Sequence, residues 1–133
     1  SKTAASLLAI EVDKRMKDSG IRAFSVHPGG IITPLQRHLE QEEMVALGWM
    51  DKEGQPTELV AKMFKTATQG ASTSLWAATS PQLDDIGGVY CENCEVAAPT
   101  DDAENARFIG VNDWAVDSEE ASRLWDETEL MLS

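Results

Sequence analysis

The sequence is short of basic residues and long apolar runs, and each shortage argues against a class of protein. Eleven basic residues stand against twenty-three acidic ones in a chain of 133 residues, which gives a formal net charge of −12. This balance argues against binding to nucleic acid, whose phosphates need Lys and Arg, and against binding to an anionic membrane surface. No apolar run is long enough to span a membrane and no signal peptide is present, so we expect a cytoplasmic protein with no membrane span.

Cysteine and histidine are also scarce. Cys91 and Cys94 form a C-x-x-C pair, a pattern found in redox and zinc sites. His27 and His38 are separated by ten residues, which is not a usual spacing of zinc ligands. The run G-G-V-Y-C-E, residues 87–92, is typical of a strand, and at the rise of an extended chain the two cysteine Cα atoms lie roughly 10 Å apart, beyond the reach of a disulfide. We expect two reduced structural cysteines and no metal, and a zinc-binding module remains a third alternative.

The apolar pattern alternates between helical and extended segments. It predicts helices over residues 2–18, 67–80 and after Asp117, strands over 21–26 and 89–92, and short helices between 35 and 64. The first helix has apolar residues on more than one face, so we expect it to be buried on several sides. The alternation is typical of an α/β protein with parallel strands. Two such strands do not form a stable covered sheet alone, so we expect the sheet to continue on the N-terminal side.

Several ends of these elements have their own sequence signals. Gly20 follows the first helix, where a left-handed residue is favoured. Thr66 and Gln69 fit a capping box that starts a helix at residue 67. Asp117 begins the last helix with an acidic first turn. Gly70 lies inside a predicted helix, where glycine is unfavourable, so we expect it to contact a neighbouring backbone closely.

The segment S-V-H-P-G-G-I-I-T-P, residues 25–34, directly follows the first predicted strand. In open α/β sheets, ligands bind beyond the carboxyl ends of the strands. Glycines there let the backbone approach a flat ligand, and a free N–H followed by the Thr33 hydroxyl offers the donor and the acceptor that a carboxamide needs. Taken alone, Pro-Gly-Gly after a strand is more often a simple turn.

Together these features resemble the short-chain dehydrogenase/reductase family. The sequence opens with Ser1-Lys2 on an apolar helix, and a strand, the pattern P-G-x-x-x-T and a charged flap with apolar residues follow. The segments K-T-A-T-Q-G-A-S-T-S-L-W (65–76), G-G-V-Y-C-E-N-C (87–94) and R-L-W-D-E-T-E-L (123–130) are most similar to the retinol dehydrogenase-like branch. One departure is Ala67, where that branch often has proline.

The resemblance covers essentially the whole chain but only the C-terminal half of the family. It implies the C-terminal portion of a Rossmann-type doubly wound parallel sheet, with residues 1–133 forming one half of a single dinucleotide-binding oxidoreductase domain. The Gly-rich dinucleotide loop, the residue that selects NAD or NADP, and the catalytic serine and tyrosine would all lie upstream. We therefore expect the chain alone to be inactive.

The resemblance also implies a site for NAD or NADP. Lys2 matches the catalytic lysine of the family's Y-x-x-x-K motif, where it would bind the nicotinamide ribose and lower the pKa of the tyrosine. Ile31 would offer its N–H to the nicotinamide carboxamide, and Thr33 its hydroxyl. The remaining implied residues are Pro28, Gly29 and Gly30, which press the nicotinamide ring into place, and Leu35, Leu39, Met44 and Trp49 on a substrate flap over residues 35–55.

These features favour an oxidoreductase that moves a hydride between a nicotinamide cofactor and a small-molecule alcohol or carbonyl substrate. A homo-oligomer formed through the helix over residues 2–18 is expected, because this helix packs against its mate in the family. The alternative is a catalytically inactive remnant that acts as a protein interaction module. His27 is expected to be a packed, hydrogen-bonded residue rather than a catalyst, and Trp76 and Trp125 core or interface residues.

Overall fold

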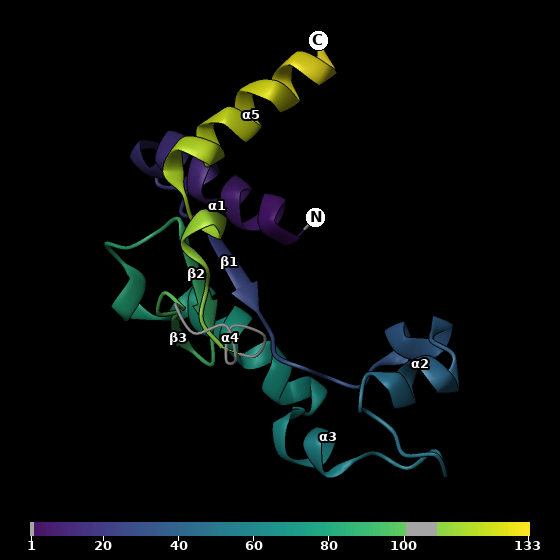
Figure 1. Cartoon of the computed structure of the whole chain (residues 1–133). Helices are drawn as coiled ribbons and strands as arrows, with labels where there is room; N and C mark the ends of the chain where they lie inside the picture. Colours follow the sequence, from purple (N-terminus) through teal and green to yellow (C-terminus); the bar gives the residue numbers. More distant parts are fainter. Residues whose placement is uncertain (1, 101–108) are drawn as a thin grey trace. The chain divides into compact units, whose positions relative to one another are not determined.

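The computed structural model describes residues 2–100 and 109–133, and the chain divides into two compact units. The first, here called the sheet unit, contains Ser1–His27 and Thr73–Ser133. The second, here called the loop unit, contains Pro28–Ser72. Figure 1 traces both along the chain. No helix in the described part of the chain is both long enough and apolar enough to cross a membrane.

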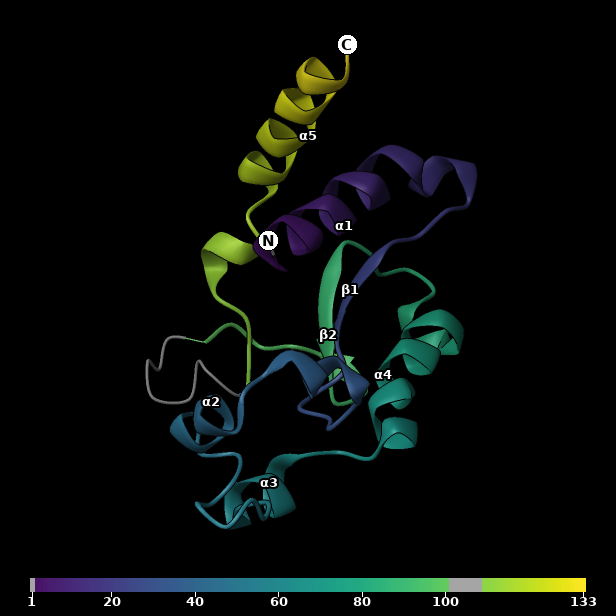
Figure 2. The same ribbon diagram turned by 90° about the vertical axis from the view of Figure 1, so that its right-hand side faces the viewer.

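The sheet unit is built on a small mixed sheet with the order β1-β2-β3. β1 (Phe24–His27) and β2 (Val89–Glu92) are parallel, with Phe24 opposite Val89 and His27 opposite Glu92. β3 (Glu95–Val96) pairs antiparallel with β2. In Figure 2, α1 (Lys2–Met16) lies across β1 and β2, and α5 (Ser118–Leu132) packs on α1. An α/β fold with parallel neighbouring strands, as in part of a Rossmann-like sheet, is confirmed.

The remaining elements are short, apart from one helix that runs from the loop unit into the sheet unit. That helix is α4 (Ala67–Thr79), and it begins and ends within one residue of the prediction. The others are the 3-10 helices η1 (Lys17–Ser19), η2 (Pro34–His38), η3 (Pro81–Leu83) and η4 (Asp113–Ala115), and the α-helices α2 (Gln41–Ala46) and α3 (Glu58–Met63).

The predicted helix ends agree with the structure. Gly20 adopts φ 78° after the first helix, in the left-handed region that glycine tolerates. The N–H of Gln69 donates to the Thr66 hydroxyl at 3.2 Å, and the N–H of Thr66 donates to the Gln69 side-chain oxygen at 2.9 Å, which completes the capping box. The Asp117 carboxylate accepts from the N–H groups of Glu119 and Glu120 at the start of α5.

The first strand begins three residues later than predicted, at Phe24 instead of Ile21. The Ile21 N–H still donates to the carbonyl of Met16 at the end of the preceding helix. The Ala23 N–H is taken by the carboxylate of Asp13 at 3.0 Å. Ile21 is 49% exposed and lies before the strand, although its apolar side chain predicts that it is part of it.

The third strand was missed because a tight turn lies at Asn93-Cys94. Asn93 has φ 51° and Cys94 has φ 59°, the left-handed values that a two-residue hairpin turn of the primed type requires. The strand predicted over 89–92 is confirmed, but the assumption that the chain stays extended as far as Cys94 was wrong. Both cysteines are free, as expected, with Cys91 fully buried in β2 and Cys94 exposed in the turn.

The burial of α1 differs from the prediction. Leu7 and Ala9 are buried, but Leu8 is 50% exposed and Met16 is 39% exposed. Two acidic residues of α1 are buried in their place, Glu11 at 1% exposure and Asp13 at 6%. A count of apolar residues along the helix does not reveal this, because acidic residues are almost never fully buried unless they are paired.

Each buried carboxylate has its own set of donors. Burial alone would raise the pKa of Glu11, but hydrogen bonds from Arg15 at 2.7 Å and Ser122 at 2.9 Å outweigh it, so the pKa lies below its ordinary value. The guanidinium of Arg22 lowers the pKa of Asp13 through two hydrogen bonds of 2.9 and 3.1 Å. These contacts tie α1 to α5 and to the segment that enters β1.

Candidate coenzyme site

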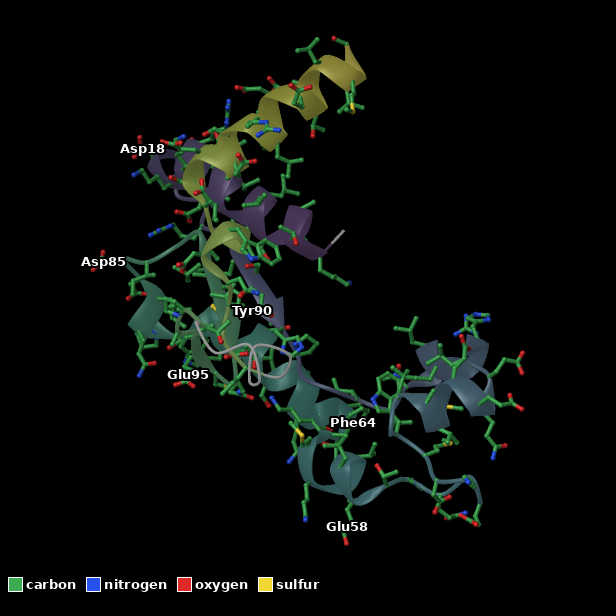
Figure 3. All side chains as sticks on the ribbon, viewed as in Figure 1. Asp18, Glu58, Phe64, Asp85, Tyr90 and Glu95 are labelled. Carbon is green, nitrogen blue, oxygen red and sulfur yellow. The ribbon has the colours of Figure 1, made fainter. Side chains whose placement is uncertain are left out.

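The proposed ligand loop, Pro28–Thr33, begins directly after the last residue of β1. Gly29 has φ 89°, and a Cβ there would lie 3.0 Å from the side-chain carbons of Lys65. A Cβ on Gly30 would lie 2.9 Å from the ring of Phe64, which is labelled in Figure 3. At Gly30 the Phe64 ring would have to shift to admit a Cβ, whereas at Gly29 the flexible end of Lys65 can move and the left-handed φ is what favours glycine.

Backbone contacts hold the same loop in register. The Lys65 N–H donates to the Gly30 carbonyl at 2.8 Å, and Ile31 forms an isolated parallel bridge with Lys65. A Cβ on Gly70 would collide with the Ile31 side chain and would lie 3.6 Å from the Pro28 carbonyl oxygen. Gly70 is closely approached, but by the Ile31 side chain; the expected close contact with a backbone is wrong, because the Pro28 carbonyl oxygen lies only at ordinary van der Waals distance.

The side chain of Gln36 closes the far end of the loop. Its Oε1 accepts from the Thr33 N–H at 2.7 Å and from the Thr33 hydroxyl at 3.1 Å, while its Nε2 donates to the Ile31 carbonyl at 2.9 Å. The Thr33 hydroxyl also accepts from the Leu35 N–H at 3.2 Å. Thr33 and Gln36 are the ends of a capping box for η2. The hydrogen bonds that cap this helix therefore also hold the end of the loop in place.

The loop fits the end of a ligand that has one acceptor and one donor. Within residues 2–100 and 109–133, the Ile31 N–H donates to no other group. The Thr33 hydroxyl is half-buried and donates its proton to Gln36, which leaves it as an acceptor. A carboxamide carries the matching pair, a carbonyl oxygen and an NH₂ group.

The predicted flap, residues 35–55, is a folded segment of the loop unit. Asp51 accepts from the N–H groups of Glu53 and Gln55, which makes a compact turn after α2. Thr57 joins this turn to α3, because its hydroxyl donates to the Gly48 carbonyl at 2.6 Å and its N–H donates to the Trp49 carbonyl at 3.1 Å.

The four predicted flap residues differ in exposure. Leu35 is 75% exposed, and Leu39, Met44 and Trp49 are half-buried. The indole of Trp49 meets the ring of Phe64 edge to face, with centroids 5.6 Å apart. Part of the apolar surface of the flap thus packs within the loop unit, and Leu35 remains available to a ligand. Contact of any of the four with substrate stays a prediction.

Lys2 lies in the sheet unit, exposed in the first turn of α1, and Ser1 is outside the described residues. Thr33 belongs to the loop unit. A shared site between Lys2 and Thr33 therefore stays a prediction.

His27, Tyr90 and Glu92 lie together at the end of the parallel strand pair. The rings of His27 and Tyr90 are stacked with centroids 6.5 Å apart, and His27 Nδ1 is 4.0 Å from Glu92. The His27 ring stacks on Tyr90, but its side chain stays 43% exposed, so the expected packing is only partial. Its expected hydrogen bond is wrong for the described part of the chain, because 4.0 Å is too long for one. Burial and the Glu92 charge raise the pKa of Tyr90, labelled in Figure 3, which keeps its hydroxyl protonated.

Phe64, Lys65 and Gln36 were missed from the sequence as contributors to the loop. The signal for Gln36 was present, because T-P-L-Q at 33–36 has the same T-x-x-Q pattern as the capping box at Thr66. Phe64 and Lys65 gave no local signal, since their contacts depend on how the chain returns after α3. In the described ranges, 2–100 and 109–133, no three His, Cys, Asp or Glu side chains gather in a way that would hold a metal.

Comparison with known proteins adds an independent result. No family model matches the chain. The chain is 35% identical over 133 residues to the "Short-chain dehydrogenase/reductase prx1" of Penicillium roqueforti, a match that covers 100% of the chain and 37% of that protein. It is 40% identical over 126 residues to a "Probable oxidoreductase" of Streptomyces lividans, covering 95% of the chain and 41% of that protein.

A human relative points to the predicted branch. "Retinol dehydrogenase 11" of Homo sapiens is 32% identical over 126 residues, covering 95% of the chain and 32% of that protein. The chain thus spans well under half the length of each of these relatives. The predicted resemblance, to the C-terminal part of a longer family sequence, is confirmed.

Proposed function

Because the chain belongs to the short-chain dehydrogenase/reductase family and matches its relatives over 37–41% of their length, we propose that it is the C-terminal half of a nicotinamide-dependent oxidoreductase domain. The substrate class is a small-molecule alcohol or carbonyl compound. The cofactor is NAD or NADP, which supplies or accepts the hydride when bound. The relatives named as oxidoreductases support the general activity.

In this proposal the loop binds the nicotinamide end of the cofactor. The Ile31 N–H donates to the carboxamide oxygen, and the Thr33 hydroxyl accepts from the carboxamide NH₂. Pro28, Gly29 and Gly30 bring the backbone close to the ring, on the side of the loop that does not pack against Lys65 and Phe64. The observation that carries the proposal is this pairing of an available N–H with a hydroxyl restricted to acceptance, two residues apart.

In the same proposal, Lys2 binds the ribose of the cofactor and assists the proton transfer. Its ammonium binds the ribose hydroxyls of the cofactor and, through its positive charge, lowers the pKa of an upstream tyrosine that serves as general acid or base. Its exposed position in the first turn of α1 is compatible with contact to a ligand. The flap over residues 35–55 covers the substrate, with Leu35, Leu39, Met44 and Trp49 as its apolar contacts.

A homo-oligomer formed through α1 is also part of the proposal. α1 and α5 border an apolar groove of about 490 Å³ in the sheet unit. Leu8, half-exposed on α1, lines this groove together with Leu124 and Trp125 of α5. Covering such a surface with an apolar partner is favourable because it removes apolar area from water.

The experiment is a coenzyme titration of the complete protein that contains this chain, with wild type and Thr33→Val. Loss of one hydrogen bond to the ligand predicts about tenfold weaker binding of NAD or NADP. Thr68→Val is the matched control, because Thr68 is an exposed threonine of the same unit, outside the loop. If neither coenzyme binds to wild type, or if both variants behave alike, the alternative of an inactive interaction module is favoured.

A further inference from the structure

Gln36 controls which way the Thr33 hydroxyl can hydrogen-bond. The amide orientation of Gln36 is fixed by its neighbours: the Thr33 N–H requires an acceptor, and the Ile31 carbonyl requires a donor. Only one assignment satisfies both, with Oε1 toward Thr33 and Nε2 toward Ile31.

This assignment decides the role of the hydroxyl. The Thr33 oxygen lies 3.1 Å from Gln36 Oε1, which can only accept, so the hydroxyl must donate its single proton there. The Leu35 N–H already donates to the same hydroxyl at 3.2 Å. The Thr33 hydroxyl therefore has no proton left for a ligand and can meet one only as an acceptor.

We propose that Gln36 is a positioning residue that makes the loop selective for a carboxamide, by holding the Thr33 hydroxyl as an acceptor and the Ile31 carbonyl away from the ligand. The inference rests on the proposed function of the loop. A ligand group with an N–H donor is accepted beside Thr33, and a group of the same shape without one is not. Gln36 itself need not touch the ligand, since it acts through Thr33 and Ile31.

A suitable probe differs from the coenzyme only in this donor. The 3-acetylpyridine analogues of NAD and NADP keep the carbonyl oxygen and replace the NH₂ group with a methyl group. For the complete protein, the ratio of the dissociation constants of analogue and natural coenzyme reports the hydrogen bond to Thr33. One such bond predicts a ratio of about ten for wild type. The ratio is a binding measurement and does not depend on turnover.

Two substitutions separate the functions of the amide. Gln36→Met keeps the length of the side chain but neither accepts nor donates as the amide does, so the hydroxyl is released and the ratio should fall to about three or lower. Gln36→Glu keeps acceptor oxygens for Thr33 and loses only the donor to Ile31. The ratio should therefore remain near the wild-type value in Gln36→Glu, even if both coenzymes bind more weakly.

The Thr33→Val background distinguishes failure of this inference from failure of the proposed function. There the ratio should be about one, and Gln36→Met should not change it further. If Thr33→Val lowers the ratio of dissociation constants but Gln36→Met does not, the positioning role is wrong while the proposed function of the loop stands. The same conclusion follows if Gln36→Glu lowers the ratio as much as Gln36→Met does. If wild type binds no coenzyme, or Thr33→Val leaves the ratio intact, the proposed function fails. Should Gln36→Met unfold, as seen in its thermal midpoint, Gln36→Glu decides alone.

Discussion

At the scale of single residues, the most constrained groups of the sheet unit are acidic side chains. Asp13 is buried and accepts two hydrogen bonds from the Arg22 guanidinium and one from the Ala23 N–H. A carboxylate taken out of water is stable only with such partners. The same cluster explains the glycine at position 87, since a Cβ there would collide with Asp13 and Arg22.

Asp13→Asn should lower the free energy of unfolding by about 2 kcal/mol at pH 7, because hydrogen bonds to a charged group are replaced by weaker neutral ones. The pKa of Asp13 is lowered in the folded chain, first by Arg22. Its contribution to stability is therefore complete above the unfolded-state pKa of about 3.9 and is lost as the pH falls through the lower folded-state value. The measurement is urea unfolding of both proteins from pH 7 to pH 3.

The difference between wild type and Asp13→Asn should shrink as the pH falls below about 4. Glu127→Gln is the control, because Glu127 is exposed on α5 and should show little effect at any pH. A difference that stays constant down to the lowest pH would mean that the charge of Asp13 contributes nothing, and that the substituted side chain merely packs worse.

At the scale of elements, the hairpin between β2 and β3 depends on a residue in an unfavourable conformation. Cys94 has φ 59° without being glycine, and its N–H donates to the hydroxyl of Thr73, a residue of α4 that is almost fully buried. The turn thus joins the sheet to a helix as well as joining two strands. The backbone bond survives substitution of Cys94, but the contact of its Sγ with the Thr73 hydroxyl at 3.9 Å does not. Two variants that both lack the thiol therefore test the conformational preference when they are compared with each other.

Cys94→Val should destabilise the chain by about 1–2 kcal/mol, because β-branched residues tolerate the left-handed region poorly. Cys94→Asn should be close to neutral, since asparagine adopts this conformation more readily. The measurement is the midpoint of urea unfolding for both variants. Since Cys94 is exposed, loss of buried area does not confuse the comparison. Equal midpoints for the two variants would contradict a left-handed turn at this position.

Element types were predicted well from the sequence, and element limits less so. The capping box at Thr66 and the cap at Asp117 are local, so their residues alone predict the starts of α4 and α5. β1 and β3 depend on other segments: β1 begins only where Val89 lies opposite Phe24, and β3 exists only because Asn93 turns the chain. The apolar pattern of one strand does not predict where its pairing with another strand begins or ends.

The candidate site likewise combines features that local sequence predicts with contacts that depend on distant segments. The Pro28–Thr33 loop could be proposed from its position after a strand and from the resemblance, and its glycines do meet close neighbours. Phe64 and Lys65, which make those close approaches, come from a distant part of the chain, beyond the flap and α3. Gln36 was predictable in principle, because its T-x-x-Q pattern was present in the sequence and was applied only at Thr66.

At the scale of the whole molecule, charge limits what this chain can do with an anionic coenzyme. The formal net charge is −12, and the chain has only eleven lysines and arginines. Several of them are already engaged, including Arg22 with Asp13 and Arg15 with Glu11. In the proposal the loop would offer one N–H and one hydroxyl to the nicotinamide end, and no cationic or helix N-terminal site of this chain is assigned to the pyrophosphate.

The isolated polypeptide of residues 1–133 is therefore expected to bind NAD and NADP weakly and to show no measurable dehydrogenase rate. In the proposed role, Lys2 would lower the pKa of a tyrosine only where a tyrosine stands beside it, and the resemblance places that tyrosine four positions before the lysine. The test compares the isolated chain with the protein encoded together with its upstream sequence, using coenzyme titration and the change in absorbance on reduction. The proposal is supported if the upstream sequence contains G-x-x-x-G-x-G and Y-x-x-S-K and only the longer protein is active. The upstream part would then supply the dinucleotide loop and the tyrosine, and this chain the nicotinamide site. Turnover by residues 1–133 alone would overturn it, because the proton transfer would then need a donor within this chain.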